Sequence, residues 1–199
     1  MLQPNFTRAV VLEVLRAAFL KTTRHDYAHK YIENEEDVRA CVFRYVRESL
    51  DLDPRWRVFL SYSTYDNNQD QNLYKPDMIF LRGEQQHEAI SLELLVEVKN
   101  WPTYTAVQHD LTKLLQLRRR FGQDQPEVVF FAVVGRSFAP PAQLAEVTSR
   151  LQAAVSPHEG VHIWLEHHDL IYKGPWDAVN KTDPYREKLR QIVGIESQS

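Results

Sequence analysis

Seven consecutive apolar residues, VVFFAVV at positions 128–134, constrain the fold more than any other segment of the chain. A run this short, and this rich in β-branched and aromatic residues, predicts a strand. Successive side chains of a strand point to opposite faces, so this strand is apolar on both faces and both must be covered. The segment therefore predicts an α/β fold in which helices cover a central sheet.

The hydrophobic patterns of the other segments predict the order α, α, β, β, β, α, β, α, β, α. The predicted helices are 9–20, 31–50, 105–121, 143–155 and 183–194, and the predicted strands are 56–62, 74–81, 91–99, 128–134 and 161–166. This order predicts a mixed central sheet flanked by helices, with extra helices at the N-terminal and C-terminal ends.

Length and composition predict a single domain over residues 1–199. Hydrophobic residues make up 43% of the chain and charged residues 26%, which is close to the average for soluble domains. We expect the core at about 31–135, and the last helices, an edge strand and an accessory segment in 136–199. The single cysteine, Cys41, excludes a disulfide framework and a cysteine-rich zinc site.

Charge and hydropathy limit the classes of partner. The formal net charge of −3 excludes a small, strongly basic nucleic-acid coat protein, but it leaves room for a local basic groove. The apolar segment 9–20 is interrupted by Glu13 and Arg16 and is too short to span a bilayer. It also lacks the basic leader and small-residue cleavage site of a signal peptide. We therefore expect a cytoplasmic protein with no membrane partner.

The predicted strand 91–99 ends in charged residues that share one face. One face carries Leu92, Leu94, Val96 and Val98, and the other carries Glu93, Leu95, Glu97 and Lys99. Charges at the end of an otherwise buried strand cost several kcal/mol each unless they are paired or bound to a metal. A structural pair between Glu97 and Lys99 on a solvated face is one explanation, and a functional site is the other.

Asp77 brings a second carboxylate toward this strand. It opens the apolar run 78–81, and nineteen residues separate it from Glu97, enough for a hairpin that sets the two strands side by side. Two close carboxylates repel each other unless a cation lies between them, and Mg²⁺ is typically held by one or two carboxylates plus substrate phosphate. We therefore expect a Mg²⁺ site at Asp77 and Glu97, with Mn²⁺ as a substitute. Lys99 would orient the attacking water or stabilise charge on phosphoryl oxygens, which suffices for phosphodiester hydrolysis.

These residues resemble a known signature. Pro76-Asp77, followed by Glu97-Val98-Lys99, is similar to the motif of the PD-(D/E)XK nuclease superfamily. The resemblance implies a restriction-endonuclease-like αβββαβ core, which matches the order of elements predicted between residues 31 and 134. It covers about half of the chain.

A second stretch points the same way. The sequence NEEDVR at 34–39 resembles the N-E-x-D-x-R stretch in the N-terminal nuclease domain of type I restriction motor subunits. In that family the helix glutamate helps to hold the metal or its water, and the resemblance implies this role for Glu35. Glu33 and Glu36 are the alternatives. An acid favoured by the dipole at a helix N-terminus is a purely structural explanation.

The predicted helix 105–121 supplies candidate contacts to nucleic acid. His109, Lys113, Gln116 and Arg120 recur at spacings of four, three and four residues and form one polar stripe. The superfamily often carries a Gln or Lys on this helix. We expect phosphate contacts from Lys113, Gln116, Arg118 and Arg120, although an ordinary solvated helix face explains the stripe equally well.

The sequence therefore predicts a metal-dependent nuclease that acts on DNA. The resemblance implies a restriction, defence or repair setting. Its catalytic residues would be Glu35, Asp77, Glu97 and Lys99, and its metal ligands Asp77, Glu97 and Glu35. A homodimer is a further expectation, because members of the fold that cut both strands use two sites. The alternatives are a catalytically inactive nucleic-acid-binding or protein-interaction module on the same fold, and an RNA-directed nuclease.

Overall fold

The computed structural model describes residues 6–26, 32–60, 75–83, 90–155, 160–171, 188–189 and 191–192. The helices are α1 (Arg8–Lys21), α2 (Glu35–Leu50), α3 (Tyr104–Arg119), α4 (Leu144–Val155) and the short α5 (His168–Ile171). A π-helical turn, η1 (Thr22–Asp26), follows α1, and a 3-10 turn, η2 (Pro141–Gln143), precedes α4. The strands are β1 (Trp56–Leu60), β2 (Met78–Arg82), β3 (Ser91–Asn100), β4 (Glu127–Val134) and β5 (Val161–His167).

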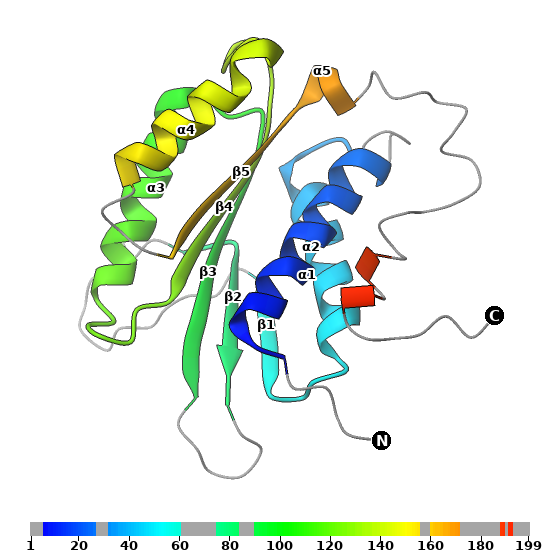
Figure 1. The fold of residues 1–199 in the computed structure, drawn as a ribbon, viewed down its shortest axis with the longest axis vertical. Helices are drawn as coiled ribbons and strands as arrows, with labels where there is room; N and C mark the ends of the chain where they lie inside the picture. Colours follow the sequence, from blue (N-terminus) through cyan, green and yellow to red (C-terminus); the bar gives the residue numbers. More distant parts are fainter. Residues whose placement is uncertain are drawn as a thin grey trace, which may run out of the picture.

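The five described strands form one mixed sheet in the order β1-β2-β3-β4-β5 (Figure 1). The pairs β1–β2 and β2–β3 are antiparallel, whereas β3–β4 and β4–β5 are parallel. Because β3, β4 and β5 run the same way, their carboxyl ends meet at one edge of the sheet, the upper end in Figure 1. The predicted α/β class, with a mixed sheet flanked by helices, is confirmed.

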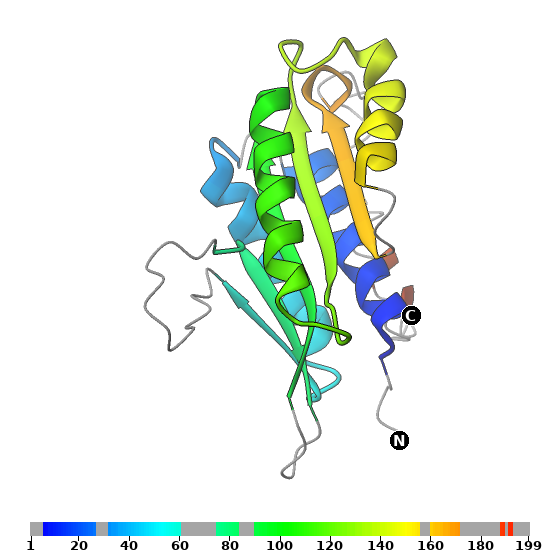
Figure 2. The ribbon, with the colours of Figure 1, turned by 90° about the vertical axis from the view of Figure 1, so that its left-hand side faces the viewer.

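Helices cover both faces of the sheet (Figure 2). The pair α1 and α2 lies on one face, and the pair α3 and α4 lies on the other. The central strand β4 contributes to both layers: Val129, Phe131 and Val133 join the core under α1 and α2, and Val128, Phe130, Ala132 and Val134 join the core under α3 and α4. All seven side chains are fully buried, as the apolar run predicts.

A capping box sets the beginning of α2. The Asn34 side chain accepts a hydrogen bond from the Asp37 backbone N–H at 3.0 Å, and the Asp37 carboxylate accepts one from the Asn34 N–H at 3.2 Å. The helix therefore starts at Glu35, four residues later than predicted. Asn34 and Asp37 of the NEEDVR stretch thus stabilise the helix start. The cap places Glu35 at the upper edge of the sheet.

Replacing Asn34 tests this cap. Asn34→Ala is expected to lower the free energy of unfolding by about 0.5–2 kcal/mol, because the first turn of α2 loses a hydrogen-bond acceptor. Urea denaturation monitored by circular dichroism measures the effect. Gln116→Ala, at an exposed position inside α3, is the control and should change stability by only a few tenths of a kcal/mol. Equal stability of the two variants would contradict the cap.

A β-bulge corrects the prediction for the first half of strand 91–99. The β2–β3 register shifts between Phe80 and Leu81, so that Phe80 pairs with Leu94 while Leu81 pairs with Leu92. The extra residue, Glu93, turns toward α1, where Arg8 Nε donates to its Oε2 at 2.6 Å. Leu92 consequently packs with the core under α3, on the face opposite Leu94. Strict alternation fails here because a bulge adds one residue to a single strand.

The remaining boundaries agree with the prediction to within a few residues. The predicted strand 74–81 begins only at Met78. Pro76, two residues earlier, has no N–H for the ladder. The predicted loop 63–72 lies outside the described residues, as do most of the terminal helix 183–194 and the accessory segment. Within the described ranges, no helix is both long and apolar enough to cross a membrane.

Candidate active site

The predicted site residues meet at the upper edge of the sheet, where β3 ends and α2 begins. Asp77 precedes β2, whose first residue, Met78, pairs with Val96 of β3. This register sets Asp77 beside the end of β3, and its Oδ2 accepts a hydrogen bond from the Val98 backbone N–H at 2.8 Å. The hairpin expected from the spacing of Asp77 and Glu97 therefore forms, and it buries the Asp77 side chain.

Glu97 and Lys99 point to the same side of β3 and form an ion pair. Lys99 Nζ lies 2.7 Å from Glu97 Oε1. The glutamate is only 3% exposed, so its charge is compensated inside the protein and not by bulk water. Such a pair costs desolvation free energy, which the mutual attraction and further hydrogen bonds must offset.

Glu35 reaches the same lysine from the other helix layer. Its Oε1 lies 3.3 Å from Lys99 Nζ, and its Oε2 accepts a hydrogen bond from the Asn100 backbone N–H at 3.3 Å. The alternative acid, Glu36, is 74% exposed and pairs with Arg39 instead. The other alternative, Glu33, contributes its backbone N–H to the Asp37 carboxylate. Of the three candidate acids on this segment, Glu35 is the one that contacts Lys99.

The electrostatic environment keeps Lys99 protonated. Burial alone would lower the pKa of Lys99, but the hydrogen bond and charge of Glu97, together with the charges of Glu35 and Asp77, raise it well above the ordinary lysine value. The side chain is therefore a cation at neutral pH and a hydrogen-bond donor. It can stabilise negative charge on a neighbouring group.

Two contacting residues are missing from the sequence-based prediction. Arg39 Nη1 donates to Asp77 Oδ1 at 3.0 Å, and Asp110 of α3 lies 3.7 Å from Lys99 Nζ and 3.8 Å from Lys113 Nζ. For both residues, the sequence contains a pattern that could have indicated a place in the site. Arg39 belongs to the NEEDVR stretch, and Asp110 is a charge at helical spacing from the buried Val107, which predicts a position near the sheet.

The carboxylate oxygens of the candidate site suit a hard cation, but the three carboxylates do not form one cluster. Among the described residues, no group of three or more His, Cys, Asp and Glu side chains is placed to hold a metal ion. The Lys99 ammonium lies between Glu97 and Glu35, and Arg39 holds Asp77. Mg²⁺ needs only one or two protein carboxylates, however, so Asp77 and Glu97 have the donor chemistry for such an ion, and their binding of it stays a prediction. Glu35 as a third ligand stays a prediction.

The predicted nucleic-acid contacts on α3 divide into two groups. Gln116 and Arg120 are exposed, and Lys113 is partly exposed next to Asp110. Arg118, in contrast, is only 9% exposed, and its Nε donates to the Pro126 carbonyl at 2.9 Å. Burial also lowers the pKa of its guanidinium. The structure thus gives Arg118 a role in holding the turn between α3 and β4, where the prediction expected a phosphate contact.

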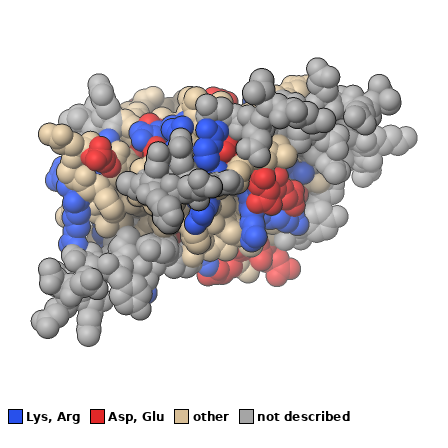
Figure 3. All heavy atoms as spheres, turned by 90° about the horizontal axis from the view of Figure 1, so that it is seen from below, with Lys and Arg blue, Asp and Glu red and all other residues tan. Residues whose placement is uncertain are grey.

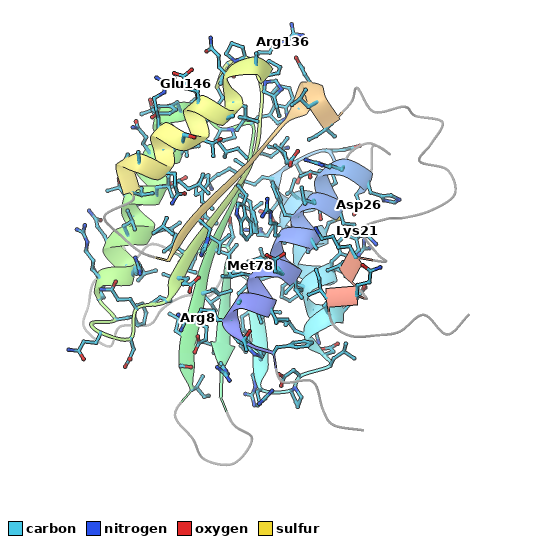
Figure 4. The ribbon with its side chains drawn as sticks, in the orientation of Figure 1. Arg8, Lys21, Asp26, Met78, Arg136 and Glu146 are labelled. Atoms are coloured by element: carbon cyan, nitrogen blue, oxygen red, sulfur yellow. The ribbon has the colours of Figure 1, made fainter. Side chains whose placement is uncertain are left out.

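The opposite end of the molecule carries mixed charges. Viewed from below, Lys and Arg atoms alternate with Asp and Glu atoms across the described part of the surface (Figure 3). Arg8, labelled near this end in Figure 4, illustrates the pattern, because it contacts both Glu93 and Glu127. This end of the described structure therefore offers acidic and basic groups in pairs.

Comparisons with protein-family models, with curated proteins and with solved structures find no match to this chain.

Proposed function

We propose that this protein is a metal-dependent nuclease with a restriction-endonuclease-like core, which hydrolyses phosphodiester bonds in DNA. The observation that carries the proposal is the Lys99 ammonium held between the carboxylates of Glu97 and Glu35, with Asp77 hydrogen-bonded to the backbone of β3 at Val98. These groups gather at the carboxyl edge of a covered sheet, a place where ligands commonly bind in α/β folds.

The topology supports the proposed core. The order from α2 to β4 is α, β, β, β, α, β, with three antiparallel strands followed by a parallel one. That order is the αβββαβ arrangement implied by the sequence resemblance. Asp77 lies directly before β2, and Glu97 and Lys99 lie on the adjacent strand β3.

Each residue of the site has a distinct proposed role. Asp77 and Glu97 would hold Mg²⁺ or Mn²⁺, which supplies Lewis-acid polarisation of the phosphate and lowers the pKa of a bound water. Lys99 donates hydrogen bonds to the attacking water or to a phosphoryl oxygen, where negative charge develops. Glu35 positions the Lys99 ammonium and the end of β3, and Arg39 positions the Asp77 carboxylate.

A non-catalytic module on the same scaffold is the second candidate, and a specific observation favours it. The negative charges of the acids are already balanced by basic side chains of the same chain. Arg39 contacts Asp77, and Lys99 contacts Glu97 and Glu35. Such a network needs no metal to be stable. The two candidates therefore differ in one measurable property, the response of the protein to divalent cations.

Thermal denaturation distinguishes these candidates. A bound cation should raise the free energy of unfolding, by about 2.7 kcal/mol at a concentration one hundred times the Kd. We expect Mn²⁺ and Mg²⁺ to raise the Tm of the wild-type protein and to leave that of Asp77→Asn nearly unchanged. If neither cation changes the Tm of the wild-type protein, the non-catalytic module is favoured.

A matched pair of substitutions tests the role of Glu35. Glu35→Gln removes the charge next to Lys99 and is expected to slow cleavage by about tenfold or more, in the range of a lost supporting contact. Glu36→Gln makes the same chemical change one residue later, at an exposed position, and is expected to cleave at the wild-type rate. Initial rates on plasmid DNA measure both. Equal rates for the two variants would remove Glu35 from the site.

A further inference from the structure

Trp101 follows the candidate site directly and adopts a costly backbone conformation. Its φ of +57° lies in the left-handed region, and it is the only residue other than glycine with positive φ in the described part of the chain. A bulky side chain there is a genuine outlier, and such strain tends to occur at functional positions. The conformation turns the chain at the end of β3, two residues after Lys99.

The surroundings of Trp101 hold its ring at a fixed place. Its backbone N–H donates to the Val133 carbonyl at 2.7 Å, which ties the residue to the end of β4. The ring packs over Gly135 so closely that a Cβ at that position would lie 2.8 Å from Cζ3. His168 closes one side, with ring centroids 4.4 Å apart and an interplanar angle of 60°.

Trp101 nevertheless remains 51% exposed. A half-exposed aromatic ring that packs against Gly135 and His168 resembles a preorganised stacking platform. It lies at the upper end of the molecule, where Arg136 follows Gly135 (Figure 4). The neighbouring Asn100 links it to the site, because the Asn100 backbone N–H binds Glu35.

We infer that Trp101 stacks on an unpaired base of the DNA strand next to the phosphate that is cleaved. The inference rests on the proposed function, since it takes the ligand of this edge to be a nucleic acid. Bases inside a duplex already stack on one another, so an indole platform favours an unstacked base. The substrate class is therefore DNA with a single-stranded segment at the cleavage position.

Binding without cleavage tests the inference. Fluorescence anisotropy with a labelled single-stranded 12-mer and its duplex, in EDTA, gives the Kd of each without turnover. Trp101→Ala is expected to weaken single-strand binding by about 5- to 100-fold, the range of one lost base–aromatic stack. Trp101→Phe should retain most of the affinity. Phe59→Ala, at another exposed aromatic on the edge strand β1, is the control and should bind as the wild type does.

Two further probes separate stacking from a structural role. Gly135→Ala keeps the indole but displaces it, and it should weaken single-strand binding while the far-ultraviolet circular dichroism stays unchanged. A series of single-stranded 12-mers, each with one abasic position, locates the stacked base. At one position the missing base should weaken binding by the wild-type protein but leave binding by Trp101→Ala unchanged. Such coupling requires direct contact between the ring and that base.

The outcomes are distinguishable from those of the proposed function. Single-strand binding that depends on Trp101, in a protein that never cleaves, would support the stacking site and overturn the nuclease. Metal-dependent cleavage with equal single-strand affinity of the wild type and Trp101→Ala would overturn the stacking site alone. Equal losses on single strands and duplex, or the absence of any abasic position that couples to Trp101, would also overturn it.

Discussion

Lys99→Ala is expected to abolish metal-dependent DNA cleavage, with a loss of at least about 10²- to 10³-fold in rate, the usual effect of removing one donor that stabilises transition-state charge. The ammonium is the centre of the site, because it contacts Glu97, Glu35 and Asp110. The charges of Glu97, Glu35 and Asp77 raise its pKa, which keeps it a hydrogen-bond donor at neutral pH. Conversion of supercoiled plasmid to nicked and linear forms measures the rate.

The Lys99→Ala experiment needs controls for folding and for charge. Arg150→Ala removes a cation from an exposed ion pair with Glu146 on α4, and it should retain most of the activity. Circular dichroism should show the same secondary structure in both variants. If Lys99→Ala cleaves within about threefold of the wild-type rate, the lysine has no catalytic part and the proposed chemistry is wrong.

Glu97→Gln is expected to lose both cleavage and the stabilisation by Mn²⁺. The amide has nearly the same shape and can still accept a hydrogen bond from Lys99, so the fold should persist. It lacks the charge that a divalent cation requires, however, and Glu97 is the most buried acid of the site. We expect a rate at least about 10²-fold below that of the wild type and no rise of Tm with Mn²⁺.

Glu146→Gln provides the matched control for Glu97→Gln. Glu146 lies on α4 (Figure 4), where its side chain is 68% exposed and pairs with Arg150 of the same helix. This variant should cleave and respond to Mn²⁺ as the wild type does. Retained Mn²⁺ stabilisation in Glu97→Gln would show that the cation binds elsewhere, and it would remove Glu97 from the set of ligands.

Much of the fold could be predicted, because buried positions are occupied by apolar residues in a recognisable pattern. The VVFFAVV run predicted a strand covered on both faces, and the structure buries all seven side chains. The bulge at Glu93 was not readable, because a single extra residue leaves the apolar pattern of 91–99 intact. The start of α2 was readable in principle, since Asn34 and Asp37 have the spacing of a capping box.

The site was predictable where side-chain direction follows from periodicity. Alternation along β3 placed Glu97 and Lys99 on one side, whereas the sequence left Glu33 and Glu36 open as alternatives to Glu35. Arg118 shows the opposite case, because it continues the buried helix positions Leu111 and Leu114 and is itself buried. The Asp77–Arg39 contact joins segments far apart in the sequence, and only tertiary structure reveals it.

Other features depend on backbone geometry that residue types do not encode. The left-handed conformation of Trp101 runs against the preference of a bulky residue, so no sequence rule would place it there. The close approach of its ring to Gly135 is likewise a consequence of packing between the ends of β3 and β4. These features emerge only once the parallel strands are set side by side.

Cleavage by the wild-type protein, with and without divalent metal, tests the central claim most directly. Purified protein is incubated with supercoiled plasmid, linear duplex, single-stranded DNA and RNA in Mg²⁺, Mn²⁺ or EDTA. The account predicts DNA cleavage that requires metal and disappears in EDTA. Intact substrates under every condition, together with a Tm that neither cation changes, would contradict it and leave a binding module on this α/β scaffold.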